Sequence, residues 1–200
     1  MNDNARASLA APASADVVAA RRLAPAELTL RRIIAVVCGA ALVAVASQFA
    51  IPLPFTPVPV SLEGGTVLLV GGLLGWRYGA LALITLLGAG AIGMPVFALG
   101  TFGLARLLGP TAGHLFAFPV AAGVVGYLAR PGAVVRSMLA ALAGMLVIHL
   151  GGWAWLAILT GSAHQAFTWG SMPFLVTDLL AVAIAGGLTA RLGARIRRSI

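Results

Sequence analysis

Five side chains in this sequence have the chemistry of a ligand-binding site, although they lie far apart along the chain. Glu63 and Asp178 are the only carboxylates after residue 28, and the other three are His114, His149 and Trp153. Carboxylates and imidazoles hydrogen-bond with polar ligands, and an indole packs against flat, partly apolar ones. Because ionisable residues are costly inside apolar helices, those found there are candidates for function.

The rest of the composition indicates an integral membrane protein. Of 200 residues, 60% are hydrophobic and 9% are charged, whereas a soluble domain has about 25% charged residues. Helices crossing a bilayer need about 20 apolar residues each. We expect such spans at residues 33–50, 61–76, 78–96, 110–129, 134–158 and 172–190. The predicted fold is an all-α membrane protein, a six-transmembrane-helix bundle over residues 29–200, with residues 1–28 as a disordered cytoplasmic tail.

The arginines predict how the bundle is oriented. With the N-terminus inside, twelve of the 13 arginines fall on the inner side, and only Arg106 falls in an outer connector. This positive-inside bias predicts that the N- and C-termini are cytoplasmic. The net charge of +8 is therefore interpreted as an orientation signal and not as a nucleic-acid-binding patch.

This orientation brings the five candidate side chains into the outer half of the bundle. Glu63 starts the second span, His114 opens the fourth, His149 and Trp153 share one face of the fifth, and Asp178 lies about 9 Å into the last. A polar layer above an apolar inner half predicts a pocket loaded from outside. Other interpretations stay open, because Glu63 could be a helix-start acid, the histidines could be packing residues and Trp153 could belong to an interfacial aromatic belt.

The sequence argues against an enzyme. Ser162 and His164 are two residues apart, so they do not face each other on a helix. The chain has no lysine and thus no lysine-bearing phosphate loop. Its single Cys38 excludes disulfides and cysteine-based metal sites within one chain. We predict no catalytic residues, no cofactor and no metal.

Four motifs follow one another along the chain: the proline-rich run 51–61, Gly90–Phe97, Gly109–Leu115 and Pro173–Leu180. In residue types and in order they resemble motifs of the BioY family, the biotin-specific S components of energy-coupling factor (ECF) transporters. The resemblance implies a multi-pass protein of the bacterial inner membrane that captures biotin or a related vitamin. It implies delivery with a transmembrane coupling subunit and ATPase subunits, and a proline-rich loop whose Phe55 and Thr56 cover the site. A stand-alone secondary transporter and an S component for another small vitamin are the alternatives.

The chain departs from the family at three positions expected to face the ligand. Glu63 stands in place of a glutamine, His114 in place of a tyrosine, and Ala181 in place of the lysine that follows the aspartate in the family motif. We therefore hypothesise that Asp178, together with Glu63, hydrogen-bonds the ureido N–H groups of biotin. The carboxylate tail would then point to donors in the outer loops, unless His114 or His149 supplies the positive charge.

Small residues on the first span form a further candidate surface. Ala35 and Gly39, and then Ala40 and Ala44, are spaced four apart, which permits close contact between helices. The resemblance implies that the coupling subunit docks on this surface. Packing within the same bundle is the alternative.

Overall fold

The computed structural model describes residues 25–200, so most of the predicted tail lies outside the described residues. Helix α3 (Pro25–Gln48) leads into strands β1 (Ala50–Leu53) and β2 (Thr56–Ser61), which pair antiparallel as a hairpin. The prediction of an all-α fold is therefore wrong in this segment. Prolines at alternating positions hold the backbone extended, and a two-stranded ladder tolerates them because each strand needs N–H donors only at every second residue.

Helix α4 (Glu63–Ala91) contains two of the predicted spans. Its helical geometry breaks at Gly75, where φ is 80° and ψ is 175°. A Cβ on Gly79 would lie 2.8 Å from the Cα of Gly71, whereas these residues would be about 12 Å apart in a straight helix. The chain thus doubles back at Gly75, close to the boundary between the predicted spans 61–76 and 78–96, and α4 forms two arms.

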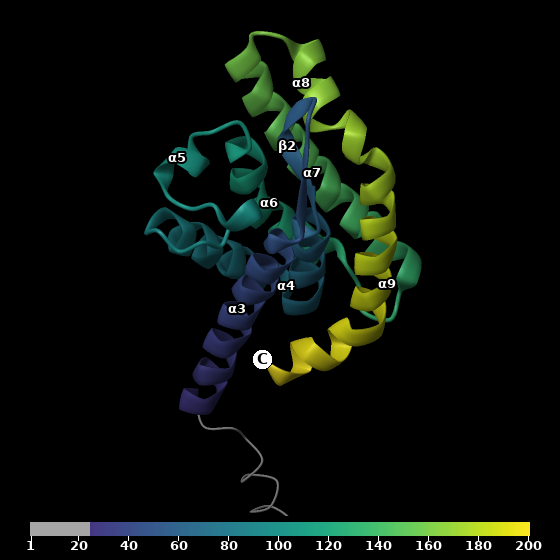
Figure 1. Ribbon diagram of the computed structural model, residues 1–200. Helices are drawn as coiled ribbons and strands as arrows, with labels where there is room; N and C mark the ends of the chain where they lie inside the picture. Colours follow the sequence, from purple (N-terminus) through teal and green to yellow (C-terminus); the bar gives the residue numbers. More distant parts are fainter. Residues whose placement is uncertain (1–24) are drawn as a thin grey trace, which may run out of the picture.

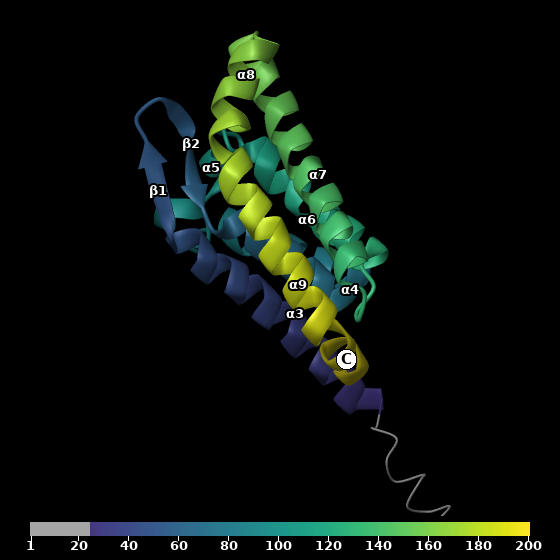
Figure 2. The same cartoon turned by 90° about the vertical axis from the view of Figure 1, so that its right-hand side faces the viewer.

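The second half of the chain supplies three more main helices. These are α6 (Ala112–Leu128), α7 (Val134–Thr160) and α9 (Leu175–Ser199). Short helical segments connect them: η1 (Ala98–Gly100) and α5 (Leu104–Leu107) precede α6, while α8 (Ala163–Gly170) and η2 (Met172–Phe174) lie between α7 and α9. In Figures 1 and 2 the start of α3 and the C-terminus lie at one end of the molecule, and α8 lies at the other.

Four helical stretches among residues 25–200 are long and apolar enough to cross a membrane. They are Ala26–Gln48, Glu63–Ala91, Val134–Thr160 and Ala163–Ser199, and α6 is a shorter apolar helix of 17 residues. Large hydrophobic side chains such as Leu139, Leu146 and Leu150 on α7 are exposed, as lipid contact requires. The protein is a mostly helical, multi-pass membrane protein, and residues 25–200 form six main helical segments, counting the two arms of α4.

Glycines set the distances between these helices. A Cβ on Gly71 of α4 would lie 2.7 Å from the Cα of Ala122 on α6, and one on Gly186 of α9 would lie 2.6 Å from the Cα of Met138 on α7. Real Cβ atoms do not approach backbone so closely, so larger residues would force the helices apart. Close helix contact of this kind is the main source of cohesion where lipid replaces water.

We expect Gly71→Ala to lower the free energy of unfolding by about 1–3 kcal/mol, because the added methyl group overpacks the α4–α6 contact. The matched control is Gly88→Ala on the same helix, where a Cβ would meet no atom within 4 Å. Thermal unfolding in detergent measures the effect. Equal midpoints for the two variants would contradict this packing.

Candidate ligand-binding site

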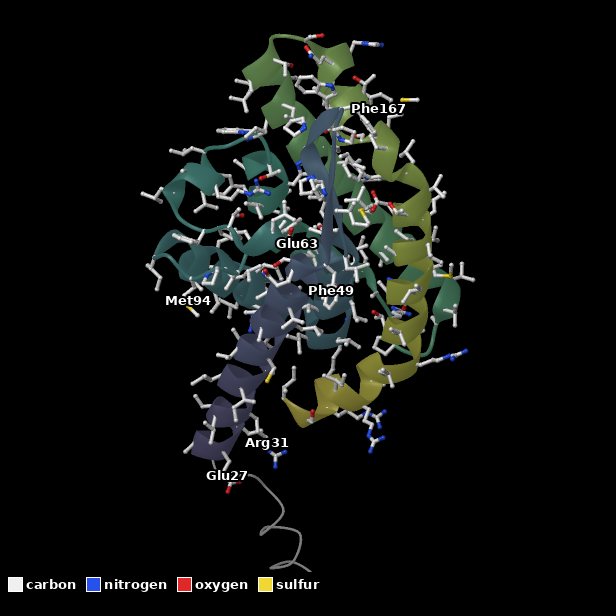
Figure 3. All side chains as sticks on the ribbon, viewed as in Figure 1. Glu27, Arg31, Phe49, Glu63, Met94 and Phe167 are labelled. Atoms are coloured by element: carbon white, nitrogen blue, oxygen red, sulfur yellow. The ribbon has the colours of Figure 1, made fainter. Side chains whose placement is uncertain are left out.

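Four of the predicted site residues line one cavity. Glu63 comes from α4, His114 from α6, His149 from α7 and Asp178 from α9. The space between these side chains amounts to about 630 Å³ when the open mouth of the cavity is included. Glu63 lies in the middle of the molecule, away from Glu27 and Arg31 near the start of α3 (Figure 3). The structure thus brings together side chains that are up to 115 positions apart in the sequence (178 − 63).

Apolar side chains form much of the cavity wall. Phe97, Phe118 and Phe174 line it, together with Met145 and Ile148. Phe97 is fully buried against Gly90, where a Cβ would collide with its ring. An apolar wall with a few polar groups is the usual composition of a site for a small organic ligand.

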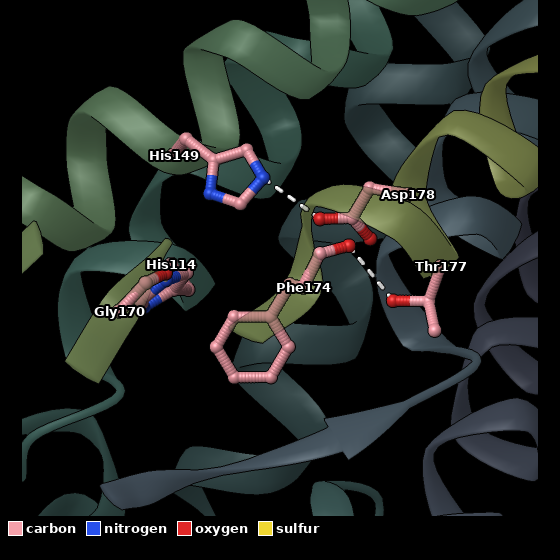
Figure 4. A network of polar contacts seen from close by, with 6 residues as sticks. All are labelled: His114, His149, Gly170, Phe174, Thr177 and Asp178. Carbon is pink, nitrogen blue, oxygen red and sulfur yellow. Dashed lines mark hydrogen bonds and ion pairs between the residues drawn. The ribbon is translucent and has the colours of Figure 1, made fainter. Parts of the chain in front are cut away.

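His149 and Asp178 form a direct contact inside this cavity. His149 Nε2 lies 2.7 Å from Asp178 Oδ2, and the two side chains are 15% and 22% exposed (Figure 4). An ionised carboxylate has no proton to donate, so His149 donates through Nε2. The Nδ1 atom of His149 is buried and has no hydrogen-bond partner among the described residues.

The hydrogen-bond donor to Asp178 therefore comes from α7 and not from α9 itself. Ala181, three residues after Asp178, packs against α4: a Cβ on Gly65 would lie 2.9 Å from the Ala181 Cβ. Ala181 does not line the cavity that holds His149. The sequence favoured His149 as a site residue but did not predict its contact with Asp178, because the spacing of 29 residues carries no periodic signal.

His114 occupies a fixed position beside this pair. Its Nε2 lies 3.3 Å from the carbonyl oxygen of Gly170, and a Cβ on Gly152 would overlap its ring. Only glycine at position 152 therefore leaves room for the imidazole between α6 and α7. The Nδ1 atom of His114 is buried without a partner among the described residues.

Two further buried polar groups in the cavity have no partner atom. Glu63 is 6% exposed and its Oε1 makes no hydrogen bond within the described chain, and the same holds for Oγ1 of Thr111. Both residues line the cavity. An unmet buried polar group costs about 1–3 kcal/mol, which a ligand with matching hydrogen-bonding groups would recover.

Arg106 is a cavity residue that the sequence reasoning missed. It lies on α5, lines the same cavity, and is not within ion-pair distance of any carboxylate among residues 25–200. Burial lowers the pKa of its guanidinium, and the charge of Glu63 opposes this shift, so the side chain stays cationic. Its position as the one arginine in the predicted outer connectors was a signal that could have identified it.

Three predicted site residues lie outside the cavity wall. Phe55 is exposed at the tip of the β hairpin, and the hydroxyl of Thr56 donates to the carbonyl oxygen of Trp169 at 2.8 Å. Trp153 donates from Nε1 to the carbonyl oxygen of Ala163 at 3.0 Å. Thr56 thus ties the hairpin to α8, and the hairpin reaches the cavity through Val58 and Pro59.

The small-residue face of α3 packs largely against the chain's own bundle. Gly39 and Ala40 are buried, and a Cβ on Gly39 would lie 2.9 Å from Leu74 Cδ1 and 3.1 Å from the Ala82 Cβ. Ala44 also packs against the core, and Ala35 is half-buried. Docking of a coupling subunit on this face stays a prediction.

No group of three or more His, Cys, Asp or Glu side chains in the described part of the chain is placed to hold a metal ion.

Comparison with known proteins shows what the chain is related to. Residues 19–198 match the model of the BioY family. A probable biotin transporter BioY of Pyrococcus horikoshii is 41% identical over 76% of this chain and 90% of its own length. The biotin transporter BioY of Thermotoga maritima is 35% identical over 82% and 96%, respectively.

A solved structure has the same fold. The crystal structure of the S-component for biotin from an ECF-type ABC transporter superposes with a TM-score of 0.77, covering 88% of this chain and 95% of that one, at 20% identity. At this identity the match concerns the fold alone. The motif resemblance of the sequence is confirmed by the family match over almost the whole chain: the protein belongs to the BioY family.

Proposed function

We propose that this chain is the substrate-binding membrane subunit, or S component, of an ECF transporter for biotin. It captures biotin from the outside and delivers it with an energy-coupling module made of a transmembrane subunit and ATPase subunits. Family membership and the names of the two relatives support this proposal. The observation that carries it is the polarity of the cavity, which has hydrogen-bond acceptors on α4 and α7 and a guanidinium on α5.

Biotin has complementary chemistry. Its ureido ring carries two N–H donors, and a short alkyl chain ends in a carboxylate. We assign the ureido end to the region of Glu63, His149 and Asp178, and the carboxylate to Arg106. The phenylalanines of the wall then cover the apolar thioether ring and the chain. An arginine suits a carboxylate because its planar N–H groups can form two parallel hydrogen bonds with it.

Purified protein in detergent is expected to bind biotin with a Kd of about 1 μM or tighter in titration calorimetry. Glu63→Leu should weaken binding about tenfold to a hundredfold, because a ligand N–H then loses its buried acceptor. Glu27→Leu, at the exposed start of α3, is the matched control. If the wild type binds another small vitamin and not biotin, the ligand is wrong. Uptake without ATPase subunits that depends on a proton gradient would instead indicate a stand-alone transporter.

Arg106→Gln is expected to weaken biotin binding at least about tenfold, because hydrogen bonds to charged groups contribute about 1.5–3 kcal/mol. The same variant should bind biotin amide, which has no carboxylate, as well as the wild type does. Arg198→Gln, at the exposed end of α9, is the control and should change neither affinity. An equal loss of affinity for biotin and for the amide would show that Arg106 does not bind the carboxylate.

The proposal includes six spans and cytoplasmic termini, supported by the distribution of arginines. In a Cys38→Ala background, which removes the exposed native thiol, His164→Cys on α8 should react with a membrane-impermeant maleimide in intact cells. Ser199→Cys near the C-terminus should react only after the cells are permeabilised. The reverse pattern of labelling would show that the protein has the opposite orientation in the membrane.

A further inference from the structure

The contact between His149 and Asp178 determines where the imidazole carries its proton. Asp178 Oδ2 lies 2.7 Å from Nε2, and a carboxylate only accepts, so the hydrogen resides on Nε2. In a neutral imidazole the second nitrogen, Nδ1, then has a free lone pair. In Figure 4 Nδ1 lies on the side of the ring that faces His114, away from Asp178.

Nothing else in the described chain satisfies this second nitrogen. Nδ1 of His149 is buried without a hydrogen-bond partner, as is Oε1 of Glu63, and both residues line the cavity. The surroundings thus offer two acceptor atoms whose partners are missing. A ligand that donates through N–H groups can satisfy both acceptors.

We propose that Asp178 is a positioning residue that fixes the tautomer of His149, and that the free Nδ1 of His149 accepts one N–H of the ligand. This inference rests on the proposed function and names the ligand class at that end of the site: cyclic ureas and related amides with at least one free N–H. In this role Asp178 acts through His149, to which its Oδ2 is bound. Selectivity against N-alkylated ligands follows, because Nδ1 would then face a methyl group.

The charge state of His149 governs this acceptor. The ionisable groups around the pair are Asp178 on α9, Glu63 on α4, Arg106 on α5 and His114 on α6. Protonation of Nδ1 turns the acceptor into a donor and so weakens binding of an N–H ligand, whereas a ligand carboxylate at Nδ1 would require the imidazolium. Because Glu63 lines the same cavity and is also ionisable, the comparison with a variant that has no imidazole at position 149 distinguishes the two arrangements.

Two substitutions of His149 distinguish the roles of its two ring nitrogens. An asparagine side chain reaches the position of Nδ1, and its oxygen can still accept there. A glutamine reaches the position of Nε2 and can donate to Asp178, but it leaves no acceptor at Nδ1. We expect His149→Gln to weaken biotin binding about tenfold to a hundredfold and His149→Asn to weaken it less than about tenfold. His164→Gln, on the exposed side of α8, is the control and should bind as the wild type does.

The pH profile and the ligand series complete this test. The loss of affinity at low pH that the wild type shows should be reduced in His149→Asn, because the amide does not titrate. Biotin methylated on a ureido nitrogen should lose affinity for the wild type and less for His149→Gln. Stronger binding of biotin at low pH, or a greater loss for Asn than for Gln at position 149, would overturn the proposal.

Nitrogen-15 spectra of histidine-labelled protein without ligand provide a reading that does not depend on biotin. The resonances of His149, identified by their loss in His149→Asn, should show a protonated Nε2 and an unprotonated Nδ1 near neutral pH. Asp178→Asn should change this distribution, since an amide can either donate or accept. A protonated Nδ1 overturns the proposed tautomer. If the spectra agree but biotin does not bind, the tautomer stands and the proposed function fails.

Discussion

The hydrogen bond between His149 Nε2 and Asp178 Oδ2 is the one close contact between a carboxylate and a basic side chain within residues 25–200, and it lies among helices that are otherwise apolar. Asp178 lies in the first turn of α9, closer to the start of the helix than the sequence predicts, and the hydrogen bond from the neighbouring imidazole stabilises its carboxylate. By joining α7 to α9 at the cavity wall, the contact also determines which polar atoms remain available. Oδ2 of Asp178 is occupied by His149, whereas Nδ1 of His149 and Oε1 of Glu63 have no hydrogen-bond partner among the described residues.

The backbone makes this arrangement possible through close helix packing. The turn at Gly75 folds α4 back on itself, and the contact of Gly71 with Ala122 holds α6 against the first arm. Gly152 gives His114 room between α6 and α7. Polar side chains from four helices therefore reach one cavity, although the sequences of these helices are mostly apolar. In a membrane, close contact at glycine positions holds the helices together, whereas in a soluble bundle the burial of apolar stripes does so.

The sequence predicted much of this arrangement, for identifiable reasons. Apolar length located the helical segments, and the boundary between the predicted spans 61–76 and 78–96 lies beside the reversal at Gly75. The rarity of ionisable residues identified Glu63, His114, His149 and Asp178. Pairing of the proline-rich segment into a hairpin was missed, since alternating prolines indicate extension but not a partner. The approach of Arg106 to the cavity was also missed, because it depends on how the connector before α6 folds.

The central claim is that the cavity holds biotin by its N–H groups at one end and by its carboxylate at the other. A structure of the protein with biotin bound tests this most directly. The account predicts the ureido ring beside His149 Nδ1 and Glu63, with the carboxylate at Arg106 and Asp178 still paired to His149. A bound biotin with its carboxylate against His149 and Asp178, or one that lies outside this cavity, would contradict it.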